Sequence, residues 1–354
     1  MSTRETASAE QQRIKDIQAT IRARGQELRQ TYPVLQHQDA IGLGIFLFAV
    51  AGVAISGWAY WVGHISAWLT IPLVALFTSL LHELEHDLIH IQYFRRHKWV
   101  QNAMLLVGWI LRPGTINPWI RRQLHFLHHK VSGTPQDLEE RGIGNGQRYG
   151  LLRALVMFDT FTGNILRALL EHPAGERWQH VRRILRANMP VSVACAVIWY
   201  GFLGFHAANG LAALAGSAID WSAPTLATMA WVNTLVVVLI APHYLRSFCI
   251  NFISSNMHYY GGVNTVLQQT QVLNAWFLWP FQLFCFNFGS THGIHHFVVG
   301  EPFYIRQMTA PVAHRVMREN GVRFNDLGTF RRANHFPARE VTEIPASHVA
   351  SPVH

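Results

Sequence analysis

The chain has 354 residues, of which 50% are hydrophobic and 14% are charged, with a formal net charge of +9. Soluble proteins carry about 25% charged residues, so this composition argues against a soluble globular protein. Membrane proteins collect basic residues on one side of the membrane, where anionic lipid headgroups attract them. This explains the net positive charge, so we expect no nucleic-acid partner.

Residues 1–38 form a polar, charged N-terminal segment, which we expect on the cytoplasmic side. An apolar stretch of the kind found in signal peptides is missing at the extreme N-terminus, which argues against a cleaved signal there. Within residues 9–30, apolar residues recur at near-helical spacing, at Ile14, Ile17, Ile21 and Leu28. This pattern predicts an amphipathic helix that rests on the membrane surface.

Four long apolar runs follow, at residues 41–63, 65–81, 188–205 and 224–245. A helix needs about 20 mostly apolar residues to cross a bilayer. We therefore predict an all-α polytopic bundle, with about four transmembrane helices in two hairpins and a cytoplasmic histidine-rich helical cap. This membrane domain would comprise residues 39–307, and a polar cytoplasmic tail would comprise residues 308–354.

Lysine and arginine are distributed unevenly between the two sides of these runs. Of the 29, six precede the first run, fifteen lie in residues 95–186, one is Arg246 and seven follow from Arg306. The short connections near His64 and Asp220 have none. By the positive-inside rule, both termini and residues 95–186 face the cytoplasm, and the protein lies in the inner (cytoplasmic) membrane.

Three further segments have a recognisable pattern. Residues 99–111 are apolar but too short to span comfortably, and residues 271–289 are aromatic and interrupted by Pro280. Both patterns predict segments at the membrane interface. Residues 151–187 have a basic, helical pattern.

Histidine is unusually frequent, with 21 residues, and most of its clusters fall beside the apolar runs. The motifs are "HELEH", "HFLHH", "HGIHH" and "NMHYYGG". Residues three and four apart share one face of a helix, so each motif points its imidazoles at one place. The nine candidate metal ligands are His82, His86, His125, His128, His129, His258, His292, His295 and His296.

Neutral imidazole is a good ligand for iron, zinc and copper. The first motif alone also reads H-E-x-x-H, the signature of a zinc protease. A catalytic zinc takes three protein ligands, so nine histidines favour two metal ions with four or five imidazoles each. A membrane zinc protease and a metal transporter remain distant alternatives.

Several neighbouring residues are candidates for holding the ligands in place. We expect Glu83 and Glu85 to accept hydrogen bonds from imidazole N–H groups, and Asn256 to lie beside the ligands. His90 continues the helix face of His82 and His86, so it is either a supporting group or a substitute ligand.

The three boxes "HELEH", "HFLHH" and "HGIHH", interleaved with membrane hairpins, resemble those of the membrane fatty acid desaturase/hydroxylase superfamily over residues 41–307. "NMHYYGG" is similar to the additional histidine region of that superfamily, and "HHKVSGTPQDLEE" to the sequence after its second box. The chain departs from the acyl-CoA branch at Ser254, where that branch has asparagine, which argues against acyl-CoA desaturation. Its length and box spacing are compatible with a bacterial branch that converts free fatty acids to terminal alkenes.

The resemblance implies two iron ions, O2 as co-substrate, and oxidation of an unactivated C–H bond in a long-chain fatty acid or acyl lipid. Desaturation and oxidative decarboxylation are the favoured outcomes, and hydroxylation of a fatty acid or alkane is the alternative. The sequence contains no flavin or nicotinamide fingerprint, so we expect an external donor of the ferredoxin and ferredoxin reductase type. Arg121, Arg122 and Arg246 are candidates for contact with the substrate head or the carrier.

Overall fold

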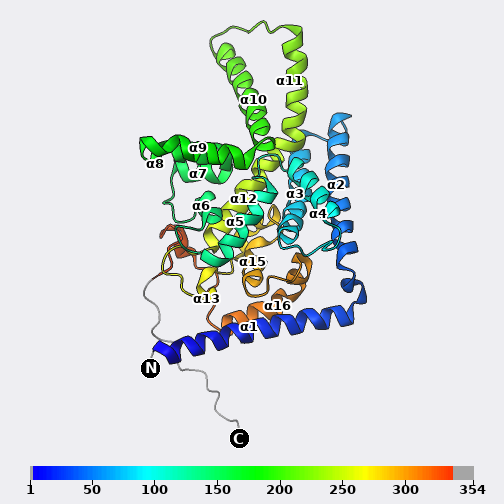
Figure 1. The fold of residues 1–354 in the computed structure, drawn as a ribbon. Coiled ribbons are helices and arrows are strands. Elements are labelled where there is room, and N and C mark those ends of the chain that lie inside the picture. Colours follow the sequence, from blue (N-terminus) through cyan, green and yellow to red (C-terminus); the bar gives the residue numbers. More distant parts are fainter. Residues whose placement is uncertain (1–2, 338–354) are drawn as a thin grey trace.

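A computed structural model describes residues 3–337 of the chain, and its regular elements in that range are all helices (Figure 1). The predicted all-α fold is therefore confirmed. The α-helices are α1 Thr3–Thr31, α2 Gln38–Trp61, α3 Ala67–Ile89, α4 Lys98–Ile110, α5 Pro118–Val131, α6 Leu138–Gly142, α7 Leu151–Phe158, α8 Thr160–Glu171, α9 Ala174–Asn188, α10 Val191–Leu214, α11 Ala223–Leu235, α12 Ala241–Met257, α13 Val266–Gln269, α14 Trp279–Leu283, α15 Phe288–Phe297 and α16 Phe303–Glu319. Short turns of other helical types are η1 Pro33–Gln36, η2 Val236–Ile240, η3 Trp276–Leu278 and η4 Leu327–Phe330.

Four helices of the described chain are long and apolar enough to cross a membrane. They are α2, α3, α10 and the continuous helix Ala223–Met257, which joins α11, the π-helical turn η2 and α12. Two hairpins result, as expected. The second helix of each hairpin runs past its apolar run, so α3 ends at Ile89 and α12 at Met257, each beside a histidine motif.

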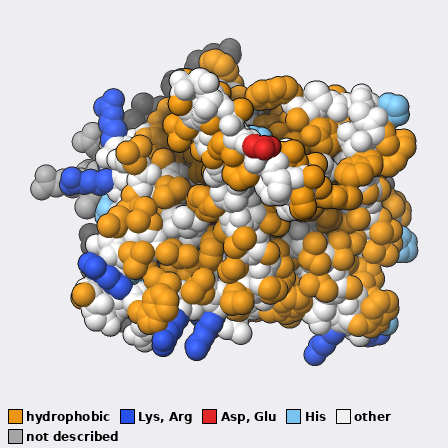
Figure 2. Space-filling model, turned by 90° about the horizontal axis from the view of Figure 1, so that it is seen from above, with side chains coloured by type: hydrophobic (Ala, Val, Ile, Leu, Met, Phe, Trp, Pro, Cys, Tyr) orange, Lys and Arg blue, Asp and Glu red, His pale blue; other side chains and the backbone are white. Residues whose placement is uncertain are grey.

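The hairpin helices expose apolar side chains on their outer faces. Trp68 is 89% exposed and Leu214 is 87% exposed. Seen from the hairpin end, hydrophobic side chains cover most of the surface, and Lys and Arg lie at its edges (Figure 2). Exposed apolar surface of this extent is unusual for a soluble protein and is suited to contact with lipid.

The two helices of the first hairpin approach each other closely at a glycine. A Cβ atom added at Gly52 would clash with ring atoms of Phe77, so no larger residue fits without a shift. This contact holds α2 against α3. It thereby fixes the helix that carries the first histidine motif.

The N-terminal helix differs from the expectation. The apolar face of α1 is buried in the protein, not laid on a membrane: Ile17 and Ile21 are both 0% exposed and belong to a core cluster with residues of α15 and α16. Arg29 of α1 also pairs with Glu301, with 2.6 Å between Nη2 and Oε2. In Figure 1, α1 lies at the end of the molecule opposite the tips of α10 and α11. It therefore closes the histidine-rich end.

The predicted boundary between residues 307 and 308 falls inside α16. Ala313 and Met317, beyond that boundary, are 0% exposed in the same core cluster. The packed part of the chain therefore continues beyond residue 308, because the apolar face of α16 completes the packing of α1, and Val322, after α16, still belongs to the same core cluster. The last part of the predicted tail, residues 338–354, lies outside the described residues.

Candidate metal centre

Each histidine motif lies on or directly after a helix whose ends are defined by local sequence. The start of α5 illustrates this: Asn117 Oδ1 accepts hydrogen bonds from the backbone N–H groups of Trp119 and Ile120, at 3.0 and 3.3 Å. Pro118 occupies the first turn, where its missing N–H costs nothing. The capped helix then carries the second histidine motif at its far end.

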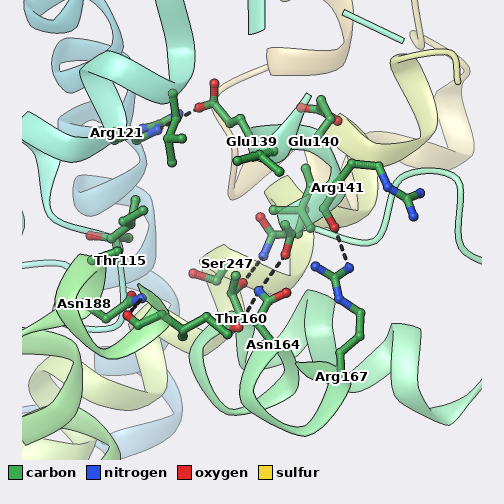
Figure 3. A pocket seen from close by; sticks show the side chains of 18 of the residues that line it. Thr115, Arg121, Glu139, Glu140, Arg141, Thr160, Asn164, Arg167, Asn188 and Ser247 are labelled. Carbon is green, nitrogen blue, oxygen red and sulfur yellow. Dashed lines mark hydrogen bonds and ion pairs between the residues drawn. The ribbon is translucent and has the colours of Figure 1, made fainter. Parts of the chain in front are cut away.

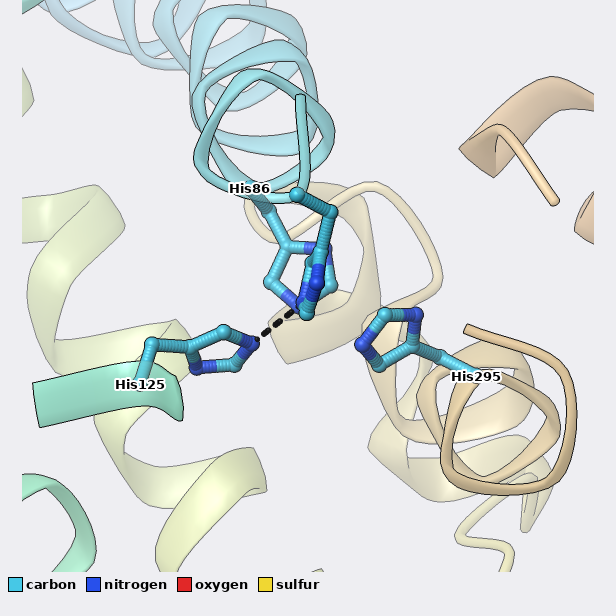
Figure 4. Close-up of side chains that lie close together, drawn as sticks. His86, His125 and His295 are labelled. Carbon is cyan, nitrogen blue, oxygen red and sulfur yellow. Dashed lines mark hydrogen bonds between the residues drawn. The ribbon is translucent and has the colours of Figure 1, made fainter. Parts of the chain in front are cut away.

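The first histidine group combines the ends of α3, α5 and α15. Its members are His86, His90, His125 and His295, whose ligand atoms all lie within 4.8 Å of one another. Figure 4 shows His86, His125 and His295 pointing toward one another from three helices. His125 Nε2 lies 2.8 Å from His90 Nε2. Ring nitrogens gathered this closely form a set of donors for one cation.

The second group is formed by His128, His258, His292 and His296, again with ligand atoms within 4.8 Å of one another. All four side chains are buried. His258 follows the last residue of α12, and its Nε2 lies 3.2 Å from His296 Nε2. The motifs at residues 125–129 and 292–296 supply members to both groups, because adjacent residues on one helix project to neighbouring faces.

Two predicted ligands lie outside these groups. His129 Nε2 lies 3.2 Å from His125 Nε2 and 3.1 Å from His295 Nε2, so it borders the first group. His82 is one helical turn before His86, and its Nδ1 lies 3.4 Å from Arg112 Nη1. His90 takes the place in the first group that the sequence suggested for His82. The nine-residue ligand set remains a prediction.

The histidines fit the divalent metal that the motifs imply. Both ring nitrogens of His86, Nε2 of His82 and Nδ1 of His292 are buried without a hydrogen-bond partner. Burial, followed by nearby positive groups, lowers the pKa of His292, His295 and His296 well below the ordinary value. Neutral rings with free lone pairs are the form in which imidazole binds metal.

Acceptors on the outer side of the rings hold several of them in place. His125 Nδ1 lies 2.7 Å from Glu139 Oε2, and His128 Nδ1 lies 2.8 Å from Asp137 Oδ2. Burial opposes charge on His128, but the hydrogen bond to Asp137 raises its pKa to about 9. An acceptor at Nδ1 leaves Nε2 to face the group. These acids were not singled out above, although the segment "PQDLEE" directly after the second motif is the signal for them.

The second group has comparable supports. His296 Nδ1 lies 2.9 Å from Gln269 Oε1, and His258 Nδ1 lies 2.9 Å from the backbone oxygen of Ser254. Glu140 Oε1 is 3.4 Å from the same nitrogen of His258. Gln269 lies 27 residues before His296 in the sequence, so only the fold could place it at this ring.

The residues expected to accept from imidazole have other partners. Glu83 Oε2 accepts from Arg306 Nη2 at 3.2 Å, and Glu85 Oε1 accepts from Arg121 Nη1 at 2.7 Å. Asn256 Oδ1 accepts from the Tyr149 hydroxyl at 2.8 Å. The direct partners of Glu83 and Glu85 are thus arginines and that of Asn256 is a tyrosine, and a supporting role of these three residues beside the ligands remains a prediction. Helix α3 turns both acids away from its histidine face, toward arginines of neighbouring segments.

Arg306 connects one of these acids to the first group. Its Nη1 lies 2.9 Å from His295 Nδ1, while its Nη2 pairs with Glu83 and lies 3.4 Å from Asp87 Oδ1. The guanidinium is 1% exposed. A single buried cation thus joins α16, α3 and α15 beside the histidines.

A cavity of about 640 Å³ opens between α5, α8, α9 and α12; His82 lines it, but the members of the two histidine groups do not. It is lined by residues of α5, α6, α8, α9 and α12, among them the apolar Ile120, Leu124, Ile184 and Ile250. Figure 3 shows Arg121 paired with Glu139 on one wall, and Asn164 and Arg167 on another. A mostly apolar cavity of this size suits a small apolar ligand such as an alkyl chain.

A single residue of the cavity wall separates the cavity from a histidine of each group. Phe288, which lines it, stacks on His292 with ring centroids 4.1 Å apart. Glu139 lines it and holds His125. His82 also lines it. A molecule in the cavity is therefore separated from the histidine groups by one layer of side chains.

The three arginines proposed to contact a head group have different surroundings. Arg121 pairs with Glu85 and also donates from Nε to Glu139 Oε1 at 3.1 Å. Arg122 donates to the backbone oxygen of Leu88 at 3.0 Å and does not line the cavity. Arg246 lines the cavity and is 1% exposed.

The fold and site together define a polytopic helical protein with two buried histidine groups beside an apolar cavity. The family model of fatty acid desaturases matches residues 61–328, more than half of the chain, and the chain belongs to that family. It is therefore an oxidoreductase of lipid metabolism and an integral membrane protein, with fatty acyl substrates and membrane lipids as its partners. No curated protein was found that matches the chain.

Proposed function

We propose that this protein is a di-iron enzyme that uses O2 to oxidise an unactivated C–H bond of a long-chain fatty acid or acyl chain. The observation that carries the proposal is the pair of buried histidine groups against one apolar cavity. All-imidazole sets suit iron better than they suit Mg²⁺ or Ca²⁺, which prefer oxygen ligands. Two irons held there would activate O2 and supply the oxidant for the C–H bond.

The residues of the chain would hold and orient both metal and substrate. The first iron would be held by His86, His90, His125 and His295, with His129 at its edge. The second would be held by His128, His258, His292 and His296. Glu139 and Asp137 would keep two of these rings in the binding orientation. The apolar wall would exclude water from the reacting chain.

Two outcomes are favoured, and both use the same co-substrates. In desaturation, two adjacent carbons each lose a hydrogen and become doubly bonded. In oxidative decarboxylation, a free fatty acid loses CO2 and a hydrogen from its β-carbon, which leaves a terminal alkene. Each outcome takes two electrons from the substrate, and a ferredoxin-type carrier supplies two more, so that O2 and four protons become two waters. Hydroxylation is the alternative.

The two hairpins would lie in the inner membrane, and the metal site would face the cytoplasm. The support is the distribution of Lys and Arg, which fall at the histidine-rich end and not at the hairpin connections near His64 and Asp220. A basic surface on this side would attract an acidic electron carrier.

Analysis of metal and products tests the proposal. The purified protein should contain about two irons per chain, as expected from two four-histidine groups. Cells that express it and receive fatty acids should form an internal olefin, a terminal alkene or a hydroxy acid, which gas chromatography separates. Zinc as the tightly held metal, or peptide hydrolysis, would point to a metalloprotease, and loosely held metal with no lipid product would point to transport.

A further inference from the structure

Arg246 has the free donors of an anion-binding residue. Its guanidinium is 1% exposed, yet Nε and Nη1 have no hydrogen-bond partner, and Nη2 has Ser247 Oγ at 3.3 Å. A buried cation without a partner is costly, and a guanidinium with two unpartnered nitrogens can donate hydrogen bonds to a carboxylate. Arg246 also lines the cavity, so a modest shift of its side chain would bring these donors to a ligand there.

The charges around Arg246 do not balance inside the protein. Arg112 and Arg121 both pair with Glu85, and Arg121 also pairs with Glu139. These two acids are thereby occupied by two arginines. Arg246 acts on this cluster through space but forms no ion pair of its own in the described chain. The positive charge of Arg246 therefore has no direct ionic partner among the described residues, and metal cations in the histidine groups would add to the positive charge nearby.

We propose that Arg246 binds the carboxylate of a free fatty acid and holds this head group beside the histidine groups, with the alkyl chain directed along the cavity toward α8 and α9. The inference rests on the proposed function and names the substrate class and its orientation. Arg246 is thus a binding residue for the acid, whereas Arg121 positions Glu85 and Glu139.

The place of Arg246 limits which carbon is oxidised. His82 lines the same cavity and lies four residues before His86 on α3, which corresponds to about 6 Å of helix. Arg246 is also near enough to His82 to act on its charge. A carboxylate at Arg246 would therefore lie on the side of the cavity near the first histidine group, and the reacting C–H bond would be among the first few carbons of the chain. Decarboxylation or hydroxylation next to the carboxylate satisfies this geometry. Desaturation in the middle of a long chain does not.

Substrate binding measured without turnover tests directly whether Arg246 binds the carboxylate. The iron-loaded full chain in lipid nanodiscs, reduced and free of O2, is titrated with hexadecanoate and separately with hexadecanol. Arg246→Gln should weaken hexadecanoate binding about 30-fold or more, as expected for loss of one partner of a buried charge pair. Hexadecanol affinity and iron content should stay within about threefold of the wild type, since the alcohol lacks the charge that Arg246 binds. Arg246→Lys should recover part of the loss.

Arg167 provides the matched comparison. It also lines the cavity, near α9, but its Nη1 donates to the backbone oxygen of Arg141 at 2.5 Å. Arg167→Gln should weaken hexadecanoate binding less than Arg246→Gln does. A larger loss in Arg167→Gln would place the head group at the far end of the cavity and overturn the proposal, as would unchanged hexadecanoate binding in Arg246→Gln.

A second measurement needs no variant and so does not depend on how Arg246→Gln folds. Hexadecanoate labelled with carbon-13 at either end is bound to the reduced wild-type protein. The carboxyl carbon should relax faster than the methyl carbon, because the paramagnetic irons would lie nearer to it, and the reverse order would overturn the proposal. If the protein holds no iron, the proposed function fails, while the titrations with Arg246→Gln still decide whether this residue binds the carboxylate.

Discussion

His125 Nδ1 and Glu139 Oε2 lie 2.7 Å apart, which joins the second histidine motif to the acidic segment that follows it. Glu139 also accepts from Arg121 Nε, at 3.1 Å, and lines the cavity. One carboxylate thus fixes the ring of a proposed ligand and neutralises an arginine beside the path of the substrate. Such outer partners of metal-binding histidines orient the ring and increase its basicity.

Replacing Glu139 should therefore weaken metal binding without removing a ligand. We expect Glu139→Ala to lower iron affinity and turnover by about 10- to 100-fold. The measurement is iron content by mass spectrometry together with product formation. The control is Glu319→Ala, at an exposed residue of α16. Wild-type iron content and activity in Glu139→Ala would show that this hydrogen bond does not support the centre.

His90 and His82 can be compared as candidate ligands of the first metal. The ligand atom of His90 lies within 4.8 Å of those of His86, His125 and His295, whereas His82 lies outside this group. We expect His90→Ala to lose about as much iron as His86→Ala, because each removes one donor of four. His82→Ala should lose less. Greater iron loss in His82→Ala than in His90→Ala would restore the set predicted from sequence.

Arg306 should be essential for stability. Its buried guanidinium pairs with Glu83 and lies near Asp87, so Arg306→Met would leave two buried carboxylates without their cation. Breaking such a pair costs about 3–5 kcal/mol. We expect a clear fall in the thermal unfolding temperature measured in detergent, while Arg315→Met, at an exposed residue of the same helix, should change it little. Equal unfolding temperatures for the two variants would contradict this role.

The orientation of the hairpins can be tested by labelling. The three native cysteines are buried, so a membrane-impermeant thiol reagent should give little background. Cysteine at Ser217, exposed in the connection after α10, should react in intact spheroplasts. Cysteine at Glu319 should react only after permeabilisation, because we place this end in the cytoplasm. The opposite pattern would reverse the proposed topology.

The membrane helices and the histidine motifs could be predicted because both depend on local sequence. Apolar runs define spans, and spacings of three and four define a helix face. The supporting residues depend on the fold instead: Gln269 reaches His296 only because α13 contacts α15. The burial of Ile17 against α16 could not be told from burial in a membrane surface, since both require the same amphipathic face. For the same reason, periodicity placed His82 and His90 on one face without deciding which joins the group.

The central claim is that iron at the two histidine groups uses O2 and external electrons to oxidise a fatty acyl chain. The most direct measurement compares turnover of a fatty acid by the purified protein with a reduced ferredoxin system, with and without O2. The oxidised lipid should form only when both O2 and reductant are present, with about one O2 consumed for each product molecule. Product that forms equally well without O2, or without any reductant, would contradict the account.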